Sequence, residues 1–169
     1  QMTWNYSQGM EVIPFGQDIL IYDSSNLRLL KLSGEEIFNV NLALDSWTLE
    51  VSDKNIYLLD KVEKTLYFIS SKGEFKNNVQ LSNISQKIVA GKNGAIAVYY
   101  RTEVGVEGTV FFSSEGKQIA DLNFPKVSIT KVMVNDQNQF TVHGVYRMAP
   151  SLTSNMYHYS SEGNLIYSS

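Results

Sequence analysis

A stretch in which serine and glycine stand between two apolar segments occurs four times in this chain of 169 residues. The copies read LKLSGEEIFNVNL, FISSKGEFKNNVQL, FFSSEGKQIADLNF and HYSSEGNLIYSS, with their glycines at Gly34, Gly73, Gly116 and Gly163. Successive glycines are 39, 43 and 47 residues apart. Self-similarity at a period of about 40 residues indicates a repeat architecture, in which every copy folds into the same unit.

Four short apolar segments surround each of these glycines. In the second copy they are TLEVSD, NIYLLD, TLYFISS and FKNNVQL, separated by short polar breaks. Segments of about six residues rich in Val, Ile, Tyr and Phe are typical of β-strands, and Ser and Gly between them are typical of hairpin turns. No segment keeps apolar residues at helical spacing over three turns, so helix is expected to be nearly absent.

Four antiparallel strands in about 40 residues are the size of one blade of a β-propeller. The sequence therefore predicts an all-β chain with four-stranded blades at approximately 10–42, 48–81, 86–124 and 129–168, and one leftover strand at 1–8. The repeated Ser-Gly stretch would be the turn between the third and fourth strands, with its glycine at positive φ because a tight turn favours glycine there. The alternative is an irregular β-sandwich whose hairpins are similar by accident.

Two arrangements of the blades are open at this point. The four units could close into a small ring, or they could form an arc of a larger propeller, since natural rings have about 4 to 8 blades. We favour the arc. The chain begins at Gln1 rather than Met, which we interpret as a processed or trimmed start from which a signal or anchor segment could have been removed.

We call the four repeated Ser-Gly turns the framed turns. They resemble the turns of loosely conserved propeller repeats in bacterial extracytoplasmic proteins, whose blades end in Ser-x-x-Gly-x. The chain is most similar in pattern to membrane-anchored propellers of Firmicutes, from Gly9 onward. The Trp-Asp signature of WD repeats and the double glycine of kelch repeats are missing. The resemblance implies a location outside a bacterial membrane, with any attachment through a segment outside this chain. A repeated β-scaffold without a convergent acid, base or nucleophile set favours a non-catalytic binding or scaffolding module.

Composition excludes several other classes of function. The formal net charge of −3 provides no basic footprint for nucleic acid. The absence of cysteine excludes disulfides and thiolate metal sites, and no apolar run approaches the roughly 18 residues of a membrane span. With 43% hydrophobic residues, the chain can bury a core.

The candidate binding residues lie in loops that join the second strand of a blade to the third, or one blade to the next. The last two blades have longer loops that begin with matching pairs, Tyr100-Arg101 and Tyr146-Arg147. Arginine suits carboxylates and phosphates, and tyrosine supplies a stacking or hydrogen-bonding surface. We predict a contact patch for a protein or polysaccharide here. In the alternative interpretation, Arg101 pairs with a neighbouring glutamate of its own loop, Glu103 or Glu107.

The loop ALDSWT adds Asp45 and Trp47 to the predicted contact patch, with Trp47 as a platform for sugar or peptide. The alternative is that Trp47 packs between blades. The stretch GVEG around Gly105 is expected to be a flexible loop without the framed turn.

The sequence predicts no catalytic residues, metal ligands or cofactor. The two histidines, His143 and His158, fall in one predicted blade as possible cross-strand neighbours, and no further ligands accompany them. The acidic residues lie mostly in turns, and no nucleophile, phosphate-loop or dinucleotide motif occurs. An enzyme of the propeller lyase, lactonase or glycosidase kind is the second hypothesis, on the analogy of fold alone.

Overall fold

In the computed structural model, residues 9–148 and 151–169 are described, and their regular structure consists of β-strands alone. The first sheet comprises β1 (Glu11–Phe15), β2 (Asp18–Tyr22), β3 (Asn26–Leu30) and β4 (Glu36–Asn41). The second comprises β5 (Trp47–Val51), β6 (Asn55–Asp60), β7 (Thr65–Ser70) and β8 (Phe75–Gln80). The third comprises β9 (Ser85–Ala90), β10 (Ile96–Arg101), β11 (Glu107–Phe112) and β12 (Gln118–Phe124). The fourth comprises β13 (Val127–Val134), β14 (Phe140–Met148), β15 (Ser151–Tyr159) and β16 (Leu165–Ser168).

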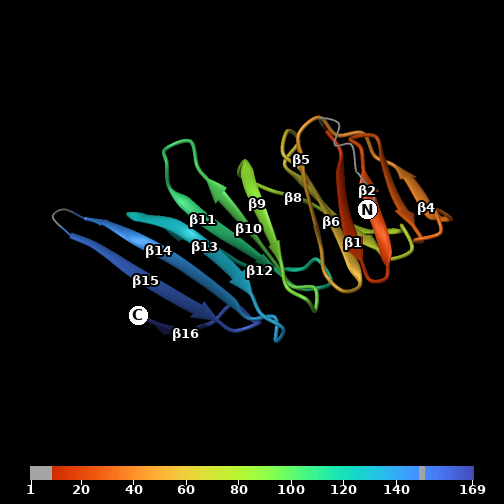
Figure 1. Ribbon diagram of the computed structural model, residues 1–169. Helices are drawn as coiled ribbons and strands as arrows, with labels where there is room; N and C mark the ends of the chain where they lie inside the picture. The colour runs from red at the N-terminus through yellow and green to blue at the C-terminus, as the bar shows by residue number, and fades with distance from the viewer. Residues whose placement is uncertain (1–8, 149–150) are drawn as a thin grey trace.

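Each sheet is a meander in which consecutive strands pair antiparallel, in the order β1-β2-β3-β4 and its equivalents. Four such sheets side by side are propeller blades, which confirms the predicted all-β propeller class (Figure 1). We call them blades 1 to 4 in chain order. Each predicted blade end lies within two residues of an observed strand end.

Blades 1 to 4 form an open arc, with the first and the last blade at opposite ends (Figure 1). Three apolar clusters hold the arc together, one at each junction between consecutive blades. Within residues 9–148 and 151–169, no comparable cluster joins blade 4 to blade 1. The described blades therefore form an open arc and not a closed four-bladed ring.

The repeated glycines form the turns between the third and fourth strands, as predicted. Their φ angles are all positive: 91° for Gly34, 82° for Gly73, 83° for Gly116 and 84° for Gly163. In the second blade, the Gly73 amide donates to the Ser70 carbonyl at 3.0 Å, and the Ser70 amide donates to the Glu74 carbonyl at 2.8 Å. The Ser70 hydroxyl accepts from the Glu74 amide at 3.1 Å. The serine of the motif thus closes the turn that the glycine permits.

The loop around Gly105 contains the same turn, so the prediction of a flexible, unframed loop is wrong there. Gly105 has φ 84° and donates to the Thr102 carbonyl at 2.9 Å. The Thr102 hydroxyl accepts from the Val106 amide at 3.0 Å, which is the role that serine has in the framed turns. The motif was missed because threonine stands in place of serine.

Candidate functional site

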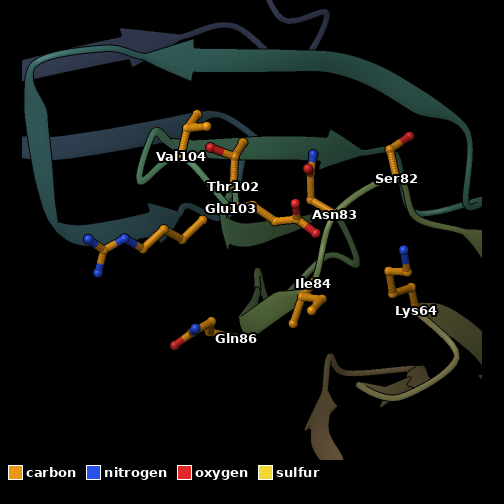
Figure 2. Close-up of a pocket in the computed structure, with 9 residues that line it drawn as sticks. Lys64, Ser82, Asn83, Ile84, Gln86, Thr102, Glu103 and Val104 are labelled. Atoms are coloured by element: carbon orange, nitrogen blue, oxygen red, sulfur yellow. The ribbon is translucent and has the colours of Figure 1, made fainter.

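A cleft of about 510 Å³ opens at one end of the junction between blades 2 and 3. It is bounded by the β6–β7, β8–β9 and β10–β11 loops, which are the kinds of loop where the sequence predicted a binding surface (Figure 2). Its lining consists of Lys64, Ser82, Asn83, Ile84, Gln86, Arg101, Thr102, Glu103 and Val104. Its volume lies within the range of about 300–1,000 Å³ that is usual for ligand sites.

Two cations border the cleft, Lys64 from blade 2 and Arg101 from blade 3. In the described residues the ion pairs are Lys31–Glu35 and Arg147–Glu107, so neither cation of the cleft is paired there. The suggested pairing of Arg101 with Glu103 or Glu107 is therefore not observed. The Arg101 side chain lies over its own turn instead. Its Nη2 atom is 3.5 Å from the position that a Cβ on Gly105 would occupy.

Two aliphatic side chains of the same cleft are exposed to solvent. Ile84 in the β8–β9 loop is 56% exposed, and Val104 at the tip of the β10–β11 loop is 87% exposed. Sequence reasoning missed both of them, although each is an isolated aliphatic residue within a polar loop, in LSNIS and in TEVG. Ile84 and Val104 thus give the cleft an exposed apolar component beside its two cations.

Arg147, predicted as the counterpart of Arg101, pairs across the junction between blades 3 and 4. Its Nη2 lies 4.0 Å from Oε2 of Glu107, whose side chain is only 10% exposed. The Glu107 carboxylate also accepts from the Tyr99 hydroxyl at 2.5 Å and from the Ile129 amide at 3.2 Å. Burial, followed by the hydrogen bond to Glu107, raises the pKa of Tyr99 to about 12. This network fixes one edge of the β10–β11 hairpin.

Tyr100 points into the protein and not toward the cleft. Its side chain is 2% exposed, and its hydroxyl lies 2.6 Å from Asp121 Oδ1 and 2.5 Å from Asn123 Oδ1. The ring fits because Gly108, opposite it on β11, has no side chain: a Cβ there would lie 2.4 Å from the Tyr100 hydroxyl oxygen. Tyr146 is half-buried and packs against the cluster between blades 3 and 4.

Asp45 and Trp47 lie at a different junction, between blades 1 and 2. Trp47 is half-buried, donates from Nε1 to the Ser24 hydroxyl at 2.9 Å, and meets the Tyr22 ring edge-on with centroids 4.6 Å apart. Asp45 is exposed in the preceding loop. The structure thus brings neither residue into the cleft with Arg101.

The histidines share one face of blade 4, but they are not directly opposite each other. His143 pairs with Met156, and His158 pairs with Thr141. The His158 ring hydrogen-bonds Thr141 at 2.8 Å and Gln139 at 3.3 Å. Among the residues that the structure describes, no group of three His, Cys, Asp or Glu could hold a metal ion. The cleft itself contains one carboxylate, Glu103, and no histidine.

Comparison with known proteins identifies a family and a fold. A family model with the description "Family of unknown function (DUF5711)" matches residues 1–128, and no curated protein matches the chain. In the described residues, no helix is long and apolar enough to cross a membrane.

Solved propellers are similar to the chain in structure. KlAtg21, in its complex with the coiled coil of AgAtg16, has a TM-score of 0.66 and 9% identity, over 90% of this chain and 53% of that one. The WD40 domain of Toxoplasma gondii coronin has a TM-score of 0.61 and 10% identity, over 94% and 44%. The Cps50 (Swd1) propeller of Myceliophteria thermophila has a TM-score of 0.58 and 10% identity, over 79% and 49%. The chain spans about half the length of these proteins, and the similarity shows the fold.

Proposed function

The chain belongs to this family of unknown function, and we propose that it is a non-catalytic binding module that holds a protein partner in the cleft between blades 2 and 3. The observation that carries the proposal is the combination of exposed Ile84 and Val104 with the unpaired cations Lys64 and Arg101. Covering the two aliphatic side chains would remove apolar surface from water, which is favourable by about 25 cal/mol per Å². The cations would give the contact its orientation.

A protein partner fits the lining better than a polysaccharide does. None of the nine residues around the cleft is aromatic, although exposed aromatic rings are the usual platforms for sugars. Two of the predicted platforms, Tyr100 and Trp47, are held by the protein's own hydrogen bonds. A mixed aliphatic and charged lining is the chemistry of a peptide contact.

We assign the other predicted contact residues either to the outer part of the contact surface or to the packing beneath it. Arg147 and Asp45 are exposed at the two neighbouring junctions, where they extend the surface beyond the cleft. Trp47, Tyr100 and Tyr146 are packed beneath the loops and hold their positions. Substitution of Arg147 would therefore act on the partner and, through Glu107, on the stability of the fold.

Display outside a bacterial membrane, through an anchor beyond this chain, is part of the proposal and rests on the sequence resemblance. Protease treatment of intact cells that express the full-length gene product is the direct measurement. We expect the propeller to be cleaved in intact cells, as an extracytoplasmic domain would be. Protection until the cells are lysed would place the propeller inside.

Cross-linking from the cleft tests the proposed function. A photoreactive amino acid at Val104 should give a discrete cross-linked product in the native cell, and one at Leu32, which is 71% exposed on blade 1, should not. The product should disappear in the Lys64→Glu/Arg101→Glu variant while the thermal unfolding midpoint stays unchanged, since Arg101 is exposed, Lys64 is half-buried, and neither is in an ion pair within the described residues. Equal products from both positions, or none from Val104, would overturn the proposed function.

A further inference from the structure

We propose that the segment held in this cleft is an extended acidic peptide in which an aliphatic side chain stands next to carboxylates. The inference rests on the proposed function and specifies the chemistry of the partner. It follows from three properties of the cleft: the sign of its charge, its exposed aliphatic groups, and its uncommitted amide side chains.

The charge of the cleft is opposite to that of the chain. Its lining carries two cations, Lys64 and Arg101, and one anion, Glu103, in a protein whose formal net charge is −3. The two cations come from different blades, so a segment that crosses the junction between blades 2 and 3 meets one cation from each side. Carboxylates are the groups that pair with both, and Arg101 can bind one of them through two parallel hydrogen bonds.

The aliphatic groups set a second requirement on the peptide. Ile84 and Val104 come from different loops and both line the cleft with their side chains exposed. A purely acidic segment would leave them in water, whereas an aliphatic side chain of the peptide would cover them. The same requirement disfavours free phosphate or an anionic sugar, neither of which carries an aliphatic group.

Asn83 and Gln86 suit the backbone of an extended segment. Both line the cleft, and within the described residues neither side chain has a hydrogen-bond partner. A carboxamide has both donors and an acceptor, so it can satisfy the N–H and the C=O of a peptide backbone together. Thr102, by contrast, already accepts from the Val106 amide.

Fluorescence anisotropy with defined probes tests the inference. The probe is a short labelled peptide of repeating Asp-Leu-Glu, compared with its Lys-Leu-Arg and Asp-Ser-Glu counterparts. The first should bind more tightly than either counterpart. Lys64→Glu/Arg101→Glu should weaken its binding about tenfold at low salt, because two attractions become repulsions, and raised salt should weaken the wild type several-fold. Ile84→Ser/Val104→Ser should weaken binding about threefold or more.

Lys54→Glu/Lys92→Glu is the matched control. It makes the same change in net charge with one exposed cation from each of the same two blades, but at the β5–β6 and β9–β10 ends, away from the cleft. It should leave peptide affinity within about twofold. An equal loss in both variants would mean that net charge alone governs binding, and the inference would fall.

Other occupants appear as separate outcomes. Binding of alginate or of phosphatidylglycerol vesicles, abolished by Lys64→Glu/Arg101→Glu while the peptide stays unbound, would replace the peptide by a glycan or a membrane. Equal binding of the basic peptide, or of the serine peptide, would also overturn the inference. A cross-link from Val104 without acidic-peptide binding would leave the proposed function intact and remove only this inference. Peptide binding without any cross-link would overturn the proposed function and leave only an affinity of the cleft for acidic peptides.

Discussion

Strands β6 and β14 have the same place in their blades, but their two faces are covered differently. In β6 every side chain from Ile56 to Asp60 is buried. In β14, Phe140 and Val142 are fully buried against blade 3, whereas Thr141 and His143 are half-buried on the other face. Blade 2 packs on blades 1 and 3, and blade 4 packs on blade 3 only, among the described residues.

The amino-acid sequences of β6 and β14 reflect this difference in burial. NIYLLD is apolar at four consecutive positions, because alternate side chains pack on opposite neighbouring blades: Ile56 and Leu58 contact blade 1, and Tyr57 and Leu59 contact blade 3. FTVH alternates, as a strand with one covered face does. In these two strands, the continuous and the alternating apolar pattern correspond to two covered faces and to one.

The turn glycines also differ in how closely a neighbouring blade packs on them. A Cβ at Gly73 would lie 2.8 Å from Phe38 of blade 1, and one at Gly163 would lie 2.8 Å from Ile119 of blade 3. At Gly34, in the first blade, nothing lies within 4 Å. Each later turn packs on the preceding blade, so glycine there serves both the turn and the junction.

The largest expected effect comes from truncating a side chain on an inner junction. Leu59→Ala should reduce the free energy of unfolding by about 3 kcal/mol, because Leu59 is fully buried between blades 2 and 3. Val145→Ala, on the uncovered face of β14, should cost about 1 kcal/mol or less. Urea unfolding of both variants measures the difference. Similar losses would mean that the second face of blade 4 is covered in solution.

The turn glycines give the next largest effect. Gly73→Ala should cost about 2–3 kcal/mol, from positive φ and from contact with Phe38, whereas Gly34→Ala should cost about 1 kcal/mol from φ alone. Gly105→Ala should behave like Gly34→Ala, since only the flexible end of Arg101 is near. The thermal unfolding midpoints of the three variants measure these losses of stability. If Gly34→Ala were as costly as Gly73→Ala, packing on the preceding blade would contribute nothing.

Two hydrogen bonds provide a smaller contrast between a junction and the uncovered face. Tyr99→Phe removes a donor from the buried carboxylate of Glu107 and should cost about 1–2 kcal/mol. Thr141→Val removes the partner of half-buried His158, which water can replace, and should cost about 0.5 kcal/mol. Chemical denaturation at neutral pH compares them. A larger loss for Thr141→Val would reverse the ranking of the two faces.

Stability should also depend on alkaline pH. Burial raises the pKa of Tyr22, Tyr99 and Tyr159 from 10.0 to about 12. The folded state therefore favours the neutral phenols, so their contribution is complete below about pH 10 and is lost as pH rises toward about 12. Urea unfolding at about pH 8 and about pH 11 should show the decrease, with a shallower slope in Tyr99→Phe. If the loss of stability with pH were equally steep in Tyr99→Phe and in the wild type, groups other than Tyr99 would cause it.

The sequence alone determined the blades and their turns. Each framed turn depends on residues within a few positions of one another: the hydroxyl of Ser70 caps the amide of Glu74, and Gly73 supplies the positive φ. Because these interactions join residues that are close together in the chain, they produce a sequence pattern that predicts the turn. The first blade lacks the leading serine and has Lys31 in its place, yet Gly34 alone still preserves the turn.

The tertiary structure decided which of the predicted contact residues reach the surface. Alternation places Tyr99 and Tyr100 on opposite faces of β10, but only the pairing of β10 with β11 shows that Tyr100 enters the space above Gly108 while Tyr99 meets Glu107. Glu107 in turn pairs with Arg147, 40 positions away on the next blade. This last contact depends on how one sheet is placed against the next, and the residues of a single strand do not show that placement. The cleft exists for the same reason, since its lining comes from three loops and from the ends of β9 and β10, which come together only after folding.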